Sequence, residues 1–265
     1  MNDTSLDYVV RMNDKGVLTC YQQVPVKTVT LAALARHVME TRGDRPLCTP
    51  LLPSGEGACR VYAETGASVG FLMQCNPLIR TLRYVVRNEA VSYDYTVDDT
   101  YNDASGNTAY MFKVSMPWMW VLCKFFKKEN NVCQWRRCFL CATYRNLERM
   151  GDRVYVAPLP NQWGSSGLMC TGDIINESLE TDKPGLECRK FLFRLFDSYF
   201  NDDLKPAMPQ LIRRSGLIHT LGEWERQTKD SPGIGLNTDL GMVPYGTLED
   251  FMNNGMGGAH DDDRG

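Results

Sequence analysis

The chain has 265 residues, 43% of them hydrophobic and 23% charged, a composition that is ordinary for a folded protein with a sizeable core. Its net charge of −3 provides no basic face, so nucleic acid is not an expected partner. The apolar runs are too short to span a bilayer, and the N-terminus has neither the basic start nor the apolar stretch of a signal peptide. We therefore expect a cytoplasmic protein with no membrane partner.

Two β-hairpins and a helix are predicted near the N-terminus. Residues 8–12 and 17–24 are β-branched or alternating runs around an Asp-Lys-Gly turn, which is typical of a hairpin. Residues 28–41 place apolar side chains at helical spacing and end at a glycine. Residues 60–63 and 69–73 predict a second hairpin.

The middle of the chain is rich in predicted strands. Residues 82–86 favour a strand or a short helix, residues 90–95 favour a strand, and the polar stretch 98–107 favours a long loop. Residues 110–126 form two apolar runs broken at Pro117, which predicts two strands or one bent strand. After a turn the next strands are predicted at 138–144 and 154–157.

Helices are predicted to dominate the last third. Residues 184–200 have an apolar face and a proline suited to the first helical position. Shorter helices are expected at 208–215 and 217–229, with a short segment at 248–252. We expect an α+β domain over 1–205, a helical C-terminal extension over 206–252 and a disordered tail over 253–265.

A single loop holds the residues with the clearest chemical potential. Pro160 and Asn161 lead into a Gly/Ser-rich stretch that presents Cys170 between an apolar pair and a Thr-Gly turn. A loop exposes a thiol, and neighbouring N–H groups can stabilise a thiolate or an oxyanion. The sequence does not indicate a papain-like Cys-His pair, in which a histidine activates the thiol. The three histidines, His37, His219 and His260, are all far from Cys170 in sequence.

The order Pro-Asn, glycine-rich loop, apolar pair and cysteine resembles the active-site segment of ubiquitin-conjugating enzymes. Over stretches 10–39, 155–172 and 186–200 the chain resembles the PRTRC system protein B family, a prokaryotic plasmid- and phage-encoded group similar to those enzymes. The chain departs from the pattern at Leu159, where the ubiquitin-conjugating motif has histidine. The loop to Cys170 is also one residue longer.

The resemblance implies a fold, an activity and partners. The fold would be an antiparallel β-meander flanked by helices, ubiquitin-conjugating-enzyme-like, with an N-terminal hairpin-helix elaboration. Cys170 would carry a ubiquitin-like modifier as a thioester and transfer it to an amine, and Asn161 would donate to the oxyanion. The expected partners are a ThiF-like adenylating enzyme and a ubiquitin-like β-grasp protein, with no cofactor. Pro160, Trp163 and Gly167 would shape the binding surface.

Alternative interpretations remain open for the same loop. Cys170 can be an ordinary thiol in a turn, and Asn161 can form only a local Asx-turn. Trp163 can cover the site or anchor the loop. The chain would then be a catalytically inactive accessory module of the same fold.

Ten cysteines also invite a metal interpretation. Cys133, Cys138 and Cys141, with Cys170 further on, have the spacing of a plant-type 2Fe–2S ferredoxin. Cys138 and Cys141 have opposite parity on a predicted strand, however, so they would face opposite sides of the sheet. Without a secretion signal, we expect reduced core thiols in place of disulfides, an iron–sulfur cluster or a zinc site. We likewise expect Trp118 and Trp120 to pack against a helix.

Overall fold

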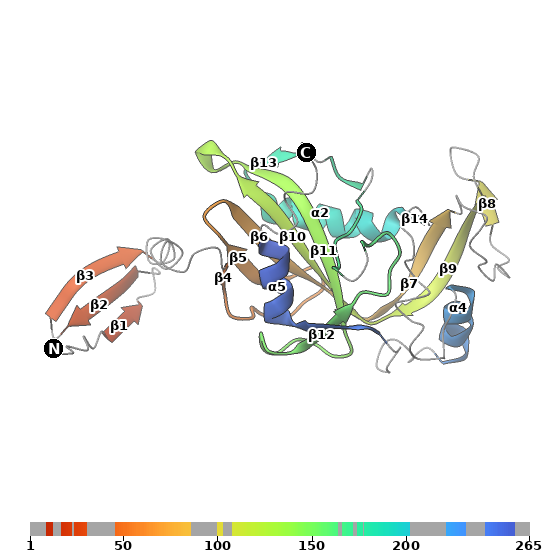
Figure 1. Cartoon of the computed structure of the whole chain (residues 1–265), viewed down its shortest axis with the longest axis horizontal. Helices are drawn as coiled ribbons and strands as arrows, with labels where there is room; N and C mark the ends of the chain where they lie inside the picture. Colours follow the sequence, from red (N-terminus) through yellow and green to blue (C-terminus); the bar gives the residue numbers. More distant parts are fainter. Residues whose placement is uncertain are drawn as a thin grey trace.

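A computed structural model describes residues 9–12, 17–22, 24–30, 46–85, 100–102, 108–163, 166–171, 174–176, 178–201, 221–231 and 242–257. For residues up to 30, and for 100–102 and 108–109, it describes the main chain only. Mixed α+β architecture with mostly antiparallel strands is confirmed (Figure 1).

The largest element is an eight-stranded antiparallel sheet with the strand order β15-β12-β11-β10-β6-β5-β4 and β13 beside β11. Its central pairs, β6 with β10 and β10 with β11, are long and register-matched over most of their length. The strands are β4 (Leu47–Cys48), β5 (Cys59–Glu64), β6 (Ser68–Cys75), β10 (Trp118–Lys127), β11 (Cys133–Thr143), β12 (Arg153–Val156), β13 (Glu180–Thr181) and β15 (Pro244–Thr247).

A second sheet of four strands has the order β14-β7-β9-β8. Its strands are β7 (Leu78–Val85), β8 (Thr100–Asn102), β9 (Thr108–Met116) and β14 (Tyr199–Asn201). Cys75 pairs with Met119 in the first sheet, and Leu78 pairs with Met116 in the second. The same two-stranded ribbon therefore runs through both sheets, and it bends at Pro117, which has no N–H to donate to a ladder.

Each face of the large sheet is covered by one helix (Figure 1). Helix α2 (Pro184–Asp197) begins with proline at its first turn and buries Cys188, Phe191 and Leu195 against one face. Helix α5 (Leu248–Met256) buries Phe251 and Met252 in a separate core on the other face. A capping box starts α5, in which the Thr247 hydroxyl accepts from the Asp250 N–H and the Asp250 carboxylate accepts from the Thr247 N–H.

Helix α4 (Leu221–Asp230) closes an edge of the second sheet. The N–H of Lys113 donates to Glu225 Oε1 at 2.8 Å, and the N–H of Ser115 donates to Thr228 Oγ1 at 2.9 Å. Glu225 and Thr228 are both buried. Side chains of a helix thus satisfy the strand donors that the short strand β8 does not reach, which leaves this part of the edge unable to pair with another chain.

The N-terminal strands β1 (Val9–Met12), β2 (Val17–Gln22) and β3 (Val24–Thr30) form a separate antiparallel sheet, which stands apart from the rest in Figure 1. The hairpin predicted at 8–12 and 17–24 is confirmed by the β1–β2 pairing. The predicted helix at 28–41 is wrong at its start, because Thr28 and Thr30 pair with β2. The remainder of that prediction lies outside the described residues.

Other predicted elements are confirmed with shifted ends. The hairpin at 60–63 and 69–73 is β5–β6, and the break at Pro117 separates β9 from β10. The helix predicted over 184–200 stops at Asp197, since residues 199–201 pair in parallel with β7 as β14. Strand pairing by distant residues overrides the continuing helical pattern. Part of the predicted loop 98–107 is strand β8, and the predicted strand 90–95 lies outside the described residues.

The C-terminal region contributes to the main sheet. Strand β15 pairs with β12, and α5 packs on β5, β6, β10 and β11. Both elements fall largely in the segment expected to form a C-terminal extension, and residues expected to begin the tail continue α5 to Met256. The short segment expected at 248–252 is part of helix α5, and the central strands of the large sheet on which it packs are distant from it in sequence.

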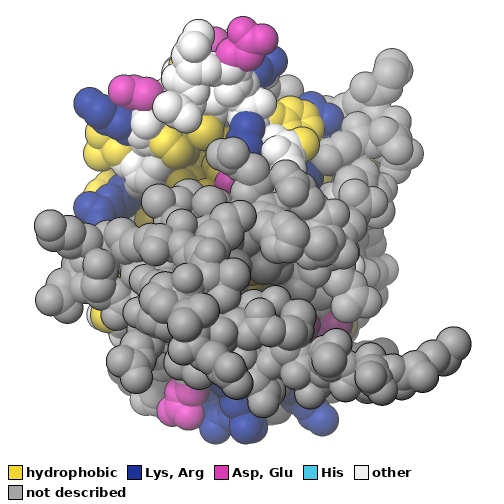
Figure 2. Space-filling model, turned by 90° about the vertical axis from the view of Figure 1, so that its left-hand side faces the viewer, with side chains coloured by type: hydrophobic (Ala, Val, Ile, Leu, Met, Phe, Trp, Pro, Cys, Tyr) yellow, Lys and Arg dark blue, Asp and Glu magenta, His cyan; other side chains and the backbone are white. Residues whose placement is uncertain are grey.

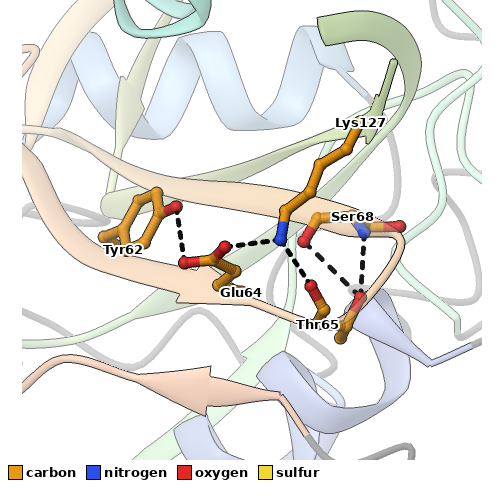
Figure 3. A network of polar contacts seen from close by, with 5 residues as sticks. All are labelled: Tyr62, Glu64, Thr65, Ser68 and Lys127. Carbon is orange, nitrogen blue, oxygen red and sulfur yellow. Dashed lines mark hydrogen bonds and ion pairs between the residues drawn. The ribbon is translucent and has the colours of Figure 1, made fainter. Parts of the chain in front are cut away.

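A polar network fastens the β5–β6 hairpin to the end of β10 (Figure 3). The Tyr62 hydroxyl donates to Glu64, which forms an ion pair with Lys127. Lys127 Nζ also donates to the carbonyl of Thr65 at 2.7 Å, and the N–H of Ser68 donates to Thr65 Oγ1. Burial, followed by the charge of Glu64, raises the pKa of Tyr62 above its usual range, so the hydroxyl remains a donor.

The surface carries charges of both signs. On the face that Figure 2 presents, the described residues show Lys and Arg side chains beside Asp and Glu, with hydrophobic side chains between them. No helix in the described part of the chain is both long and apolar enough to cross a membrane.

Candidate functional site

The segment from Asn161 to Cys170 folds back on itself as a short hairpin. Gln162 and Met169 face each other in an antiparallel bridge. The N–H of Cys170 donates to the carbonyl of Asn161 at 2.8 Å, and that of Trp163 donates to the carbonyl of Leu168. The main chain therefore places Asn161 directly across from Cys170, the two residues that the sequence singled out together.

This hairpin is seated on the outer edge of β11. The N–H of Met169 donates to the carbonyl of Cys138, and the N–H of Leu140 donates to the carbonyl of Gly167 at 2.7 Å. β11 pairs with β13 on one side of this contact and with β12 on the other. Three successive segments thus share one strand edge, and the hairpin cannot shift without breaking ladder hydrogen bonds.

Gly167 makes that seating possible. Its φ of +73° lies in the left-handed region, and a Cβ there would stand 2.5 Å from the carbonyl oxygen of Leu140. Any other residue would meet both backbone strain and a clash with fixed backbone. The structure buries Gly167, so it supports the loop from beneath and presents no side chain for binding.

Asn161 is held at both its backbone and its side chain. Its φ is +62°, a conformation that asparagine tolerates better than most residues. Its Oδ1 accepts a hydrogen bond at 3.0 Å from the N–H of Asn201, in strand β14. This contact joins the loop to the second sheet and fixes the orientation of the amide, whose NH2 group is the end able to donate to an oxyanion.

Cys170 is half-buried at the end of the hairpin. Its neighbour Cys138 is fully buried, and burial, followed by the charge of the Cys170 thiolate, raises the pKa of Cys138 above its usual range. Cys138 therefore stays protonated next to the more accessible sulfur. Of this pair, Cys170 is the thiol that solvent and a reactant can reach.

The remaining predicted binding residues divide into one exposed and two buried. Trp163 is 46% exposed at the hairpin, whereas Pro160 and Gly167 are buried. Leu159, which stands where the resembled motif has histidine, is wholly buried in the main core. Only Trp163 among these three presents a side chain to an incoming partner.

Gln162 is a positioning residue that the sequence did not reveal. It is 3% exposed, and its Nε2 donates to the carbonyls of Ala157 and Leu159, both at 2.7 Å. These bonds close the turn that delivers Asn161. A glutamine within a loop gives no sequence signal for such a contact, since the amide could equally face water.

The cysteines do not gather into a metal centre within the described part of the chain. On β11, Cys138 belongs to the core beneath α2, and Cys141 belongs to the core beneath α5. The two sulfurs lie on opposite faces of the sheet, as their parity predicted, so they cannot share one cluster with Cys133 and Cys170. Their expected role as core thiols is confirmed.

The tryptophans of β10 also follow the packing interpretation. Trp120 is fully buried, and its Nε1 donates to Thr143 Oγ1 at 2.9 Å. Trp118 stacks beside it with ring centroids 6.2 Å apart. The histidines His37, His219 and His260 all lie outside the described residues.

Comparison with known proteins adds no relative. No family model, no curated protein and no solved structure matches this chain. The geometry of the loop and the resemblance of its motif are therefore the features from which a function can be inferred.

Proposed function

We propose that this protein is a thioester carrier of the ubiquitin-conjugating type, with Cys170 as the nucleophile. The observation that carries the proposal is the pairing of Cys170 with Asn161 across the hairpin, at 2.8 Å between main-chain N and O. This main-chain bond brings together a residue with a half-buried thiol and a residue with a side-chain amide, the two groups that would serve as nucleophile and oxyanion donor in acyl transfer. The proposed ligand is the C-terminus of a β-grasp modifier, delivered by a ThiF-like adenylating enzyme.

The order of elements supports this proposal at the level of the fold. Meander strands β5, β6, β10 and β11 precede the irregular segment that bears Cys170, and helix α2 follows and packs on the sheet. A ubiquitin-conjugating fold has the same order of meander, active-site segment and helix. The additional β7–β9 ribbon, the N-terminal sheet and the β15–α5 unit would be elaborations of that fold.

The proposed reaction has two acyl transfers. The Cys170 thiolate attacks the activated carboxyl carbon of the modifier, the new C–S bond forms, and the leaving group is AMP or the thiol of the activating enzyme. An amine then attacks the same carbon, and the Cys170 sulfur leaves as thiolate while the amine loses a proton to solvent. In each step Asn161 would donate to the tetrahedral oxyanion, and Trp163 would cover the bound C-terminal peptide.

The direct test combines the full chain with ATP, a ThiF-like adenylating enzyme and a β-grasp protein. Intact-mass spectrometry should show one modifier added to the chain, removed by thiol reductant and absent in Cys170→Ala. Cys170→Ser should retain a reductant-resistant oxyester. Cys48→Ser is the matched control, because Cys48 is also half-buried, and it should leave the adduct unchanged.

A substitution at Asn161 can test its role in catalysis without disrupting the loop. Loss of an oxyanion donor slows transfer by about a hundredfold to a thousandfold. Asn161→Asp keeps the acceptor for the Asn201 N–H but removes the donating NH2, so it should slow aminolysis while the loop persists. Equal transfer by wild type and Asn161→Asp would remove the proposed role of Asn161.

A second candidate function is a binding module of the same fold without catalysis. The observation that favours it is the use of Asn161 Oδ1 as a structural tie to β14, together with a buried leucine at position 159. This candidate predicts that Cys170→Ala binds the β-grasp protein as tightly as wild type while no covalent adduct forms on either. Adduct formation on wild type would reject it.

A further inference from the structure

A pocket separate from the Cys170 hairpin lies at the connection between β11 and β12. It has a volume of about 400 Å³ and is formed by the end of β11, the connecting loop and the start of β12. Three arginines line it: Arg145, Arg149 and Arg153. Asp152 is the one acidic residue in its lining, so the lining carries a surplus of two positive charges.

The loop under this pocket is held from within the molecule by Arg60. The Arg60 side chain is 5% exposed, and its guanidinium donates to Asn146 Oδ1 at 2.8 Å and to the carbonyl of Leu147 at 3.0 Å. It also lies over the Trp120 ring, 5.6 Å from the centroid. A buried guanidinium with several fixed acceptors makes the loop a rigid part of the fold.

Helix α5 supports the same loop from the other side. The N–H of Leu248 donates to the carbonyl of Asp152, and the N–H of Glu249 donates to the carbonyl of Met150, each at 2.9 Å. Loop and helix are thereby joined by main-chain bonds. A connection held by both β5 and α5 keeps its main chain in place before any ligand arrives, which lowers the part of the entropic cost of binding that ordering the loop would add.

Asp152 organises the arginines. Its Oδ2 accepts from the N–H groups of Glu148 and Arg149, at 2.7 and 3.1 Å. Its Oδ1 lies 3.2 Å from Arg149 Nε and 3.7 Å from Arg145 Nη2. One carboxylate therefore draws two guanidinium groups to the same side of the pocket, and each still has further N–H donors to offer.

Two tyrosines form another part of the wall. Tyr144 and Tyr155 line the pocket with ring centroids 4.7 Å apart, and the Tyr144 hydroxyl accepts from the N–H of Met242 at 3.1 Å. The pocket thus combines a cationic rim with flat, fixed side chains. Such a site suits a small molecule with a doubly charged group and an organic part.

We propose that this pocket binds the phosphate group of a small phosphorylated molecule. Arginine forks bind phosphate oxygens in pairs, and a phosphate dianion balances the two surplus charges, whereas a single carboxylate balances one. Arg145 and Arg149, aligned by Asp152, form one side of the phosphate site, and Arg153 at the start of β12 forms the other.

The test measures binding of sodium pyrophosphate to the full chain by isothermal titration calorimetry, with citrate at the same ionic strength as the carboxylate comparison. Pyrophosphate should bind more tightly than citrate. Arg145→Gln, Arg149→Gln and Arg153→Gln should each weaken pyrophosphate binding by about tenfold, the loss expected for a charge-assisted contact. Arg194→Gln, an exposed arginine on α2, is the matched control and should change affinity less than about twofold.

The outcomes are distinguishable from a folding defect. Arg153 forms no ion pair with another described residue, so Arg153→Gln should keep the thermal midpoint of the wild type while losing affinity. Citrate binding as tight as pyrophosphate would overturn the choice of phosphate. Absence of pyrophosphate binding, or an equal loss in Arg194→Gln, would overturn the site itself.

Discussion

Cys48 and Cys59 are half-buried thiols outside the candidate site. Burial raises the pKa of both Cys48 and Cys59 to about 11, so each is almost entirely protonated at pH 8. The Cys59 sulfur also donates to the carbonyl of Val61. These two thiols are therefore protected from electrophiles by protonation as well as by limited access.

We predict that iodoacetamide at pH 8 alkylates Cys48 and Cys59 at least about tenfold more slowly than free cysteine, because only thiolates react and few thiols with a pKa of about 11 are ionised at pH 8. Peptide mass spectrometry after timed quenching measures each rate. The rates at Cys48 and Cys59 should keep rising up to pH 11, as their thiolate fractions grow. Alkylation of Cys48 or Cys59 as fast as that of free cysteine at pH 8 would contradict the protection of these thiols by burial.

Gly167 holds the Cys170 hairpin against β11. Replacing it with alanine should lower the free energy of unfolding by at least about 2 kcal/mol, since left-handed strain adds to the clash with Leu140 O. Urea denaturation measures the loss. Gly66→Ala is the control, because a Cβ at Gly66 meets nothing within 4 Å, and it should change stability little. If Gly167→Ala left the free energy of unfolding unchanged, the hairpin would not be packed against the β11 edge as described.

The sequence indicates which residues belong to the candidate site better than it indicates which hydrogen bonds hold them. The proximity of Asn161 and Cys170 follows from their place in one loop, and the structure brings their main chains together. The bond from Asn201 N–H to Asn161 and the role of Arg60 under a distant loop have no local signature. Long-range hydrogen bonds of this kind depend on how the elements pack, which a local pattern does not contain.

Among the elements, α4 has the clearest single contribution. Thr228 is buried, and its hydroxyl accepts from the N–H of Ser115 while donating to the carbonyl of Trp224. Thr228→Val should cost about 1–2 kcal/mol of unfolding free energy, because it leaves a buried strand N–H without an acceptor. Thr228→Ser restores the hydroxyl and should recover most of the loss in thermal denaturation. Equal losses in both variants would assign the effect to packing alone.

Predicted strands were located better than predicted helices. Alternating apolar runs gave β5, β6, β9 and β10 with ends displaced by a few residues, and Pro117 marked a real break. Helical spacing is a wrong guide where strand pairing competes, at Thr28–Thr30 and again at Tyr199 and Phe200. Both failures occur where a distant strand supplies hydrogen bonds that the local sequence does not anticipate.

For the molecule as a whole, the C-terminal region is part of the core. A chain ending at residue 231 would lose β15 and α5 and expose the apolar face that contains Leu122 and Phe139. We predict that it aggregates or loses its near-ultraviolet circular dichroism. A chain ending at residue 257 retains all of α5 and is the matched control, which should behave as the full chain does.

A milder change tests the same core without truncation. Phe251 is fully buried at the centre of α5, and Phe251→Ala should cost about 3–5 kcal/mol by leaving a cavity. Chemical denaturation of the soluble variant measures the loss. Stability unchanged by Phe251→Ala would show that α5 is an appendage, as the expected division into a domain and an extension implied.

The two-stranded ribbon of β6 and β10 continues into the ribbon of β7 and β9. One two-stranded ribbon is therefore shared between the sheets, and apolar residues from both sheets belong to one cluster beneath α2. Neither sheet can separate from the other without pulling apart its own central pairing. Heating should therefore melt the two sheets together, in one calorimetric peak.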